Sequence, residues 1–262
     1  MQTLELYFKK NKIRCRIQGQ GNRLIIAFHG FSLDGGIFDA LNGHLNPDFK
    51  LYAIDLPFHG KTKWSASSYS PTDIAEIVKQ ILFLEKKNRF EALGFSLGAR
   101  LWFKLIDAFP GQIKKLHLLS PDGIQTRGLG LASKIPNGLI KRLEKVCHSP
   151  NRMIKLANQL LRLKIINRFD FKFVKHHLSN EENRKRVFGT WLSLKQFTIN
   201  KEALKKSLKE ANIPTTFIIG KRDPLVNLSA IKKFAHPLPN TEIFLMDKSH
   251  QLIDGTLGEW IY

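Results

Sequence analysis

The chain has 262 residues, 43% of them hydrophobic, which is enough to bury a substantial core. Two cysteines and no clustered Cys and His predict neither a disulfide framework nor a metal site. No segment approaches the ~18 apolar residues that span a bilayer, and the start, MQTLELYFKKNK, lacks the apolar part of a signal peptide, so we expect a cytoplasmic protein without a membrane span.

The formal net charge of +20 is concentrated in the middle of the chain. Residues 122–200 carry 16 Lys and Arg against five Asp and Glu. No zinc-finger spacing, RNA-binding aromatic motif or helix-turn-helix pattern accompanies this charge, so we expect solvated helix faces and no nucleic-acid partner. A role in binding a charged substrate stays open as the alternative.

The first predicted elements are two strands, at 4–10 and 13–19, which form an antiparallel hairpin around an Asn11-Lys12 turn. Short apolar runs without polar alternation follow at 24–28, 51–55, 90–95, 116–120, 216–220 and 243–247. Such runs are typical of strands covered on both faces, and helical patterns such as residues 71–87 separate several of them. The sequence therefore predicts an α/β fold with a mostly parallel, twisted sheet flanked by helices.

One connection is too long for a single crossover helix, because about 95 residues separate Ser120 from Thr215. Helical apolar spacing recurs inside it, at 138–147, 151–169 and 182–199. We predict a helical lid over residues 123–200, inserted after the sixth strand and standing over the carboxyl ends of the strands. Residues 1–122 and 201–262, including a returning helix at 201–211, would form the core domain.

The motif GFSLGAR at 94–100 places Ser96 between two glycines. Residues 90–93 before it have strand character, and residues 99–109 after it have helical character until Pro110 ends the pattern. A serine at a sharp strand-to-helix turn is the setting of a catalytic nucleophile. Ser96 is therefore the candidate nucleophile.

Small residues on both sides of Ser96 would let the turn pass close to its neighbours, and Gly94 and Gly98 supply them. A helix that begins immediately after the serine directs free backbone N–H groups toward an oxyanion forming there. The Leu97 amide is the first candidate donor of an oxyanion hole.

A second donor is expected from the loop His29-Gly30-Phe31-Ser32, which follows the run at 24–28. A glycine after a strand end lets the backbone turn, so that the Phe31 amide can face the same site as Leu97. His29 itself is interpreted as structural.

Nine histidines compete for the role of general base. His250, in DKSHQL, follows the last apolar run, at the carboxyl end of a strand, where an open α/β sheet collects its site residues. His176 and His177 fall in the predicted lid, and His59 is followed by a turn glycine that indicates loop shaping. His250 is the candidate base.

For the acid, GKRDPLV places Asp223 just beyond the strand at 216–220, 127 residues after Ser96 and 27 before His250. The resulting chain order Ser, Asp, His is the one expected for this sheet topology. Asp122, in SPDG, also follows a strand end and is the alternative acid.

These motifs together resemble the α/β-hydrolase superfamily over essentially the whole chain. The segments that carry the resemblance are HGF at 29–31, DLPFHGKT at 55–62, GFSLGA at 94–99, GKRDPLV at 220–226 and SHQL at 249–252. The resemblance implies Ser96 as nucleophile, His250 as base, Asp223 as acid, and the Phe31 and Leu97 amides as oxyanion hole. The lid corresponds to the family's variable cap.

The resemblance implies a carboxylesterase-like serine hydrolase that cleaves an ester of a small acyl substrate through an acyl-enzyme, with no cofactor and no metal. The sequence departs from the family at its end. Only twelve residues follow His250, where the family commonly has a full helix, so we expect that helix to be short or truncated.

Two other functions stay open. Arg100, four residues after Ser96, is similar to the arginine in the GYSxGGR motif of the menaquinone-pathway lyase, which implies a pocket arginine for a carboxylate-bearing substrate. A basic lid, with Arg127 and Lys134 near its start, would suit such an anionic substrate. The third hypothesis is a small-molecule binding protein that keeps the Ser-Asp-His triad and hydrolyses its ligand slowly or not at all.

Overall fold

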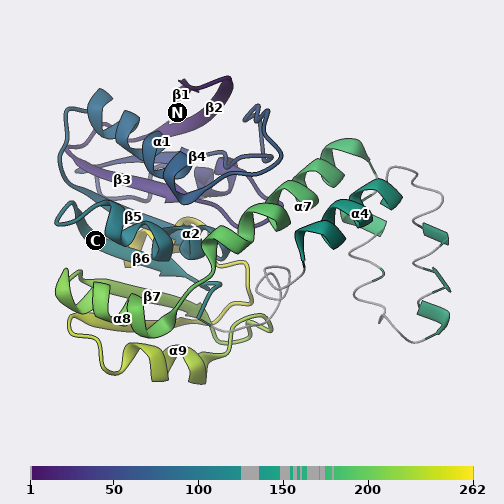
Figure 1. Ribbon diagram of the computed structural model, residues 1–262. Helices are drawn as coiled ribbons and strands as arrows, with labels where there is room; N and C mark the ends of the chain where they lie inside the picture. Colours follow the sequence, from purple (N-terminus) through teal and green to yellow (C-terminus); the bar gives the residue numbers. More distant parts are fainter. Residues whose placement is uncertain are drawn as a thin grey trace.

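A computed structural model of the protein describes residues 2–124, 136–147, 154–155, 158–159, 161–163, 171, 175–178 and 180–261. Its strands are β1 (Gln2–Phe8), β2 (Asn11–Gln18), β3 (Arg23–Phe28), β4 (Phe49–Ile54), β5 (Phe90–Phe95), β6 (Ile113–Leu119), β7 (Thr215–Gly220) and β8 (Thr241–Met246). They form one sheet in the order β1-β2-β4-β3-β5-β6-β7-β8 (Figure 1). The pairs β1–β2 and β2–β4 are antiparallel and the rest are parallel, which confirms the predicted α/β fold.

The hairpin turn lies two residues earlier than predicted. Phe8 pairs with Asn11, so Lys9 and Lys10 form the turn, and Lys9 takes the left-handed conformation with φ of 53°. Asn11 stays in the strand because its side-chain oxygen accepts hydrogen bonds from the Ser65 amide (2.8 Å) and hydroxyl (2.9 Å). This tertiary contact outweighs the turn propensity of asparagine.

The parallel strands are covered on both faces. Alternate residues of β3 divide between the faces: Leu24, Ile26 and Phe28 belong to one buried cluster, and Ile25 and Ala27 to the other. Helices cover the first face, namely α1 (Pro71–Leu84), α2 (Leu97–Leu105), α8 (Lys201–Glu210) and α9 (Leu228–Ala235). Short 3-10 segments contribute to the second face, η1 (Gly35–Leu41) and η4 (Gly255–Trp260). The segment η4 lies where the family commonly has its terminal helix, and whether that helix is short or truncated stays open.

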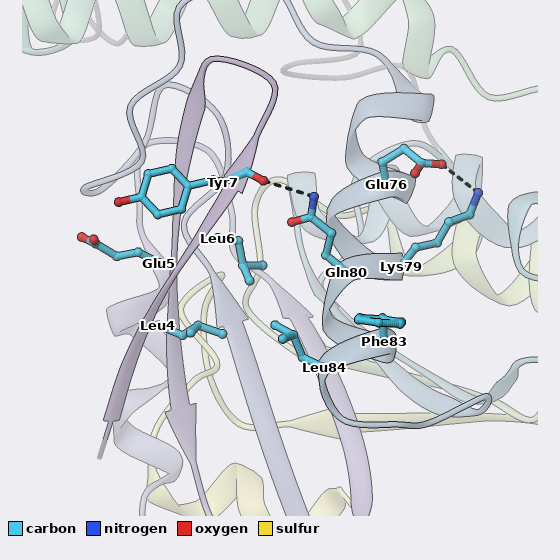
Figure 2. Close-up of a pocket in the computed structure, with 9 residues that line it drawn as sticks. All are labelled: Leu4, Glu5, Leu6, Tyr7, Glu76, Lys79, Gln80, Phe83 and Leu84. Carbon is cyan, nitrogen blue, oxygen red and sulfur yellow. Dashed lines mark hydrogen bonds and ion pairs between the residues drawn. The ribbon is translucent and has the colours of Figure 1, made fainter.

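Helix α1 packs beside the edge strand β1 (Figure 2). The Gln80 side-chain amide donates a hydrogen bond to the Tyr7 carbonyl (3.3 Å), which partly covers the open edge of the sheet. A shallow groove of about 440 Å³ lies between the two elements, with Leu4, Leu6 and Leu84 converging in it. It is built from β1 and α1, whereas the predicted site residues follow the carboxyl ends of other strands.

Of the described helices between β6 and β7, α4 (Asn137–Cys147) and α7 (Glu181–Leu194) lie to one side of the sheet (Figure 1). With residue 178 they form a separate buried cluster of Ile140, Leu178, Val187, Phe188 and Leu192. The helix predicted at 151–169 falls largely outside the described residues, as do Arg127 and Lys134. The lid boundaries at 123 and 200 therefore stay a prediction. None of the helices in the described part of the chain has the length and apolarity to cross a membrane.

Candidate active site

Ser96 occupies the turn between β5 and α2 and has φ of 50° and ψ of −109°. A positive φ is unfavourable for a residue with a side chain and persists only where neighbours hold it. Here the Ser96 amide donates to the Leu119 carbonyl (2.9 Å), and the Asp122 amide donates to the Ser96 carbonyl (3.1 Å). The adjacent strand end thus fixes the turn on both sides of Ser96.

The two glycines of the motif allow the turn to approach its neighbours, as predicted. A Cβ atom on Gly98 would lie 2.0 Å from the Phe28 carbonyl oxygen, and one on Gly94 would lie 2.6 Å from the backbone of Ala99. Both distances are far inside van der Waals contact. A larger residue at position 98 would push α2 away from the end of β3, and one at position 94 would push it away from the end of β5.

The loop after β3 lies directly against this turn. A Cβ atom on Gly30 would sit 3.4 Å from the Cβ of Ser96 and 3.1 Å from the ring of Phe95. Leu97 is the first residue of α2, where the amide has no acceptor within its own helix. Phe31 and Leu97 are thereby on the two segments that flank Ser96, and their oxyanion role stays a prediction.

His29 holds the loop after β3 through two hydrogen bonds of its ring. The Leu56 amide donates to its Nε2 (3.0 Å), so Nδ1 carries the proton and donates to the Gly30 carbonyl (2.7 Å). Burial lowers the pKa of His29, which keeps the ring neutral. The Gly30 carbonyl and the Phe31 amide belong to one planar peptide unit, so His29 also fixes the direction of the Phe31 N–H.

Asp223 and His250 are hydrogen-bonded, with 2.8 Å between Oδ2 and Nδ1. The Asp223 side chain is fully buried, and its Oδ1 accepts from the amides of Leu225 (2.8 Å) and Val226 (3.2 Å). Burial opposes ionisation, but the bonds from His250 and Leu225 and the adjacent Ser120 hydroxyl outweigh it and lower the pKa of Asp223. The ionised carboxylate can therefore accept a hydrogen bond from Nδ1 of His250, and Nε2 is the ring nitrogen that does not face Asp223.

The imidazole of His250 packs on the ring of Phe95, the residue before Ser96, with 5.1 Å between ring centroids. Its side chain is 22% exposed, so a substrate can reach it. Among the described residues, no hydrogen bond joins the Ser96 hydroxyl to His250. Such bonds are often long without substrate and tighten in the reacting complex.

Arg100 and Asp122 are paired with one another. The guanidinium donates from Nε (2.8 Å) and Nη2 (3.0 Å) to the two Asp122 oxygens, and both side chains are largely buried. The remaining Nη1 donates to the Phe197 carbonyl at 3.5 Å. Asp122 therefore lies with Arg100 and not with His250, and the geometry favours Asp223 as the partner of the histidine.

Ser120 is a site neighbour that the sequence motifs did not indicate. It is fully buried at the end of β6 with φ of 40°, beside Asp223. The available signal was its position as the last residue of the run at 116–120, at the carboxyl edge of the sheet. In the described part of the chain, no three His, Cys, Asp or Glu side chains gather as metal ligands would.

Known proteins resemble the chain over most of its length. The family model described as alpha/beta hydrolase fold matches residues 23–254. The pimeloyl-[acyl-carrier protein] methyl ester esterase of Legionella pneumophila is 24% identical over 242 residues, which cover 88% of each chain. A probable serine hydrolase of Drosophila melanogaster is 30% identical over 153 residues, covering 51% of this chain and 44% of that protein.

Solved structures show the same fold at low sequence identity. A thermophilic esterase from Thermogutta terrifontis superimposes with a TM-score of 0.70 at 14% identity, covering 96% of this chain and 92% of that one. The thioesterase domain from the curacin biosynthetic pathway gives 0.67 at 16% identity, covering 100% and 99%. Since the family model extends from β3 to beyond the last strand, the chain belongs to the α/β-hydrolase fold family.

Proposed function

We propose that the protein is a carboxylesterase-like serine hydrolase in which Ser96, His250 and Asp223 act together. The observation that carries this proposal is the buried Asp223 carboxylate, which orients His250 beside the strained Ser96 turn. The curated relatives include esterases and a probable serine hydrolase, which supports the same chemistry.

In the proposed mechanism, the Ser96 hydroxyl attacks the ester carbonyl while Nε2 of His250 takes its proton. The oxygen that becomes negative accepts hydrogen bonds from the Phe31 and Leu97 amides. His250 then returns the proton to the leaving alcohol, which leaves an acyl group on Ser96. Water, deprotonated by His250, attacks the acyl-enzyme and releases the acid. Asp223 stays ionised throughout and stabilises the charged imidazole.

For the substrate, we propose a small acyl ester that carries a negative charge. The Legionella relative is by name an esterase of a pimeloyl methyl ester held on an acyl carrier protein, and residues 122–200 here have eleven more basic than acidic side chains. A p-nitrophenyl ester with a free terminal carboxylate should have a lower KM than its terminal methyl ester. The difference should shrink as salt screens the charges.

The pairing of Arg100 counts against the lyase alternative, because its guanidinium already holds a buried carboxylate. If Arg100 instead bound substrate, Arg100→Ala would raise the KM of the charged ester and leave that of its neutral methyl ester unchanged. We expect no such selectivity.

The direct test of the mechanism is Ser96→Ala, assayed on p-nitrophenyl butyrate. We expect turnover to fall by about 10⁵-fold or more with an unchanged melting temperature, since loss of a nucleophilic serine has effects on that order. Ser67→Ala, at an exposed serine, is the matched control and should keep full activity. Activity that survives in Ser96→Ala would overturn the proposal, and a wild-type protein that binds esters without hydrolysing them would favour the binding function.

A further inference from the structure

The loop predicted to supply the Phe31 amide is held by the segment at 175–178 as well as by the core. Ser32, directly after Phe31, has φ of 65°, a left-handed conformation that is unfavourable for serine. Its hydroxyl is hydrogen-bonded to Nδ1 of His177 at 3.2 Å. This bond links residues that are 145 positions apart in the chain.

The Phe31 side chain makes a second link between the same two regions. It packs against the core cluster and also against the cluster formed by α4, α7 and Leu178. Its ring lies 5.8 Å from that of His177 and 5.9 Å from that of His59, between centroids. Phe31 is therefore enclosed by one histidine from the core and one from the segment after β6.

His177 has the protonation state that this contact needs. Burial, His176 and Arg186 lower its pKa, so the ring is neutral near pH 7. A neutral imidazole has one donor and one acceptor nitrogen, and a serine hydroxyl can serve as either partner. The bond to Ser32 therefore forms with either tautomer.

We propose that His177 is a positioning residue for the oxyanion hole. His29 fixes the Gly30–Phe31 peptide through the Gly30 carbonyl, and His177 fixes the following residue, Ser32, through its hydroxyl. Together they hold the Phe31 amide at the place where the oxyanion forms. The proposal rests on the proposed esterase function, since it assigns His177 a role in that reaction.

The experiment compares His177→Ala, Ser32→Ala and the double variant on p-nitrophenyl butyrate. Each single change should lower kcat by about tenfold, because small displacements of an oxyanion donor weaken transition-state binding by such amounts, and KM should stay within about twofold. The double variant should lose no more than His177→Ala alone, since Ser32→Ala removes only the bond that His177→Ala also removes. His177→Asn, whose side-chain amide can occupy the place of Nδ1, should recover most of the loss.

Lys175→Ala, at an exposed position in the same segment, is the control for general disturbance and should keep full kcat. The proposal is overturned if His177→Ala keeps full kcat, if the two single effects add, or if His177→Asn is as impaired as His177→Ala. Ser96→Ala separates the two proposals. If Ser96→Ala is inactive while His177→Ala is fully active, only the role proposed for His177 is wrong. If Ser96→Ala is active, the proposed esterase mechanism itself is wrong.

Discussion

The protein has two short carboxylate–imidazole contacts, one beyond the carboxyl ends of strands and one inside the sheet. Asp223 and His250 are 2.8 Å apart, and Glu91 and His117 are 2.9 Å apart; in both pairs the carboxylate side chain is at most 3% exposed. His250 follows the carboxyl end of β8 and is 22% exposed, whereas His117 lies inside β6 and is fully buried. Only the first pair can meet a substrate.

The second pair is completed by a third charged group. Arg23, at the start of β3, donates to the other oxygen of Glu91 at 2.6 Å. Burial lowers the pKa of His117, and its Nδ1 is buried without a partner, so the neutral ring donates from Nε2 to Glu91. Arg23, Glu91 and His117 together join β3, β5 and β6, so we expect them to stabilise the fold. A carboxylate paired with an imidazole is thus expected to have a different role according to its place along the strands.

The largest expected effect separates the two histidines. His250→Ala should lower turnover of p-nitrophenyl butyrate by about 10⁵-fold, because the serine would lose its base, and should leave the melting temperature nearly unchanged. His117→Asn should do the reverse, keeping turnover and lowering the melting temperature. A loss of turnover of similar size in both variants would contradict the assignment of a catalytic role to His250 and a structural role to His117.

The carboxylates should differ in the same way. Asp223→Asn should lower turnover by about 10⁴-fold, because the amide favours the wrong imidazole tautomer. Asp122→Asn, which weakens the pair with Arg100, should have a far smaller effect on turnover. If Asp122→Asn were the more damaging of the two, Asp122 would be the acid.

Glu91→Gln should change stability and not turnover. It leaves Arg23 without its ion-pair partner and weakens the bond to His117, so we expect the free energy of unfolding to fall by about 2 kcal/mol. Chemical denaturation of the wild type and the variant measures this loss. Equal stability would show that the pair contributes nothing net to the fold.

The smallest effect concerns acid pH. Burial lowers the folded-state pKa of His29, His59 and His117. In the unfolded chain a histidine takes up its proton near pH 6.5, so below that pH the unfolded state binds more protons and the free energy of unfolding falls. His117→Asn should therefore lose less stability between pH 7 and 5 than the wild type does. An identical slope would show that His117 does not titrate differently on folding.

The sequence predicted all eight strands, because buried parallel strands leave continuous apolar runs. The candidate site residues Ser96, Asp223 and His250 each follow the carboxyl end of a strand, and their joint role stays a prediction. The sequence did not predict contacts made by residues distant in sequence. Asn11 stays in a strand because of Ser65, Arg100 is bound by Asp122, and His177 reaches Ser32, and none of these pairings has a local signal. His117 lies within the apolar run at 116–120 and not beyond its end, and the structure buries it fully inside β6.

The central claim is that Ser96 is a nucleophile activated by His250 and Asp223, and covalent labelling tests it most directly. The wild-type protein is treated with a fluorophosphonate, which phosphonylates activated serines with loss of fluoride, and the adduct is mapped by peptide mass spectrometry. We predict one adduct per chain, on Ser96, formed far more slowly in His250→Ala and Asp223→Asn and at the wild-type rate in Glu91→Gln. Absence of an adduct on Ser96, or equal labelling rates in all four proteins, would contradict the account.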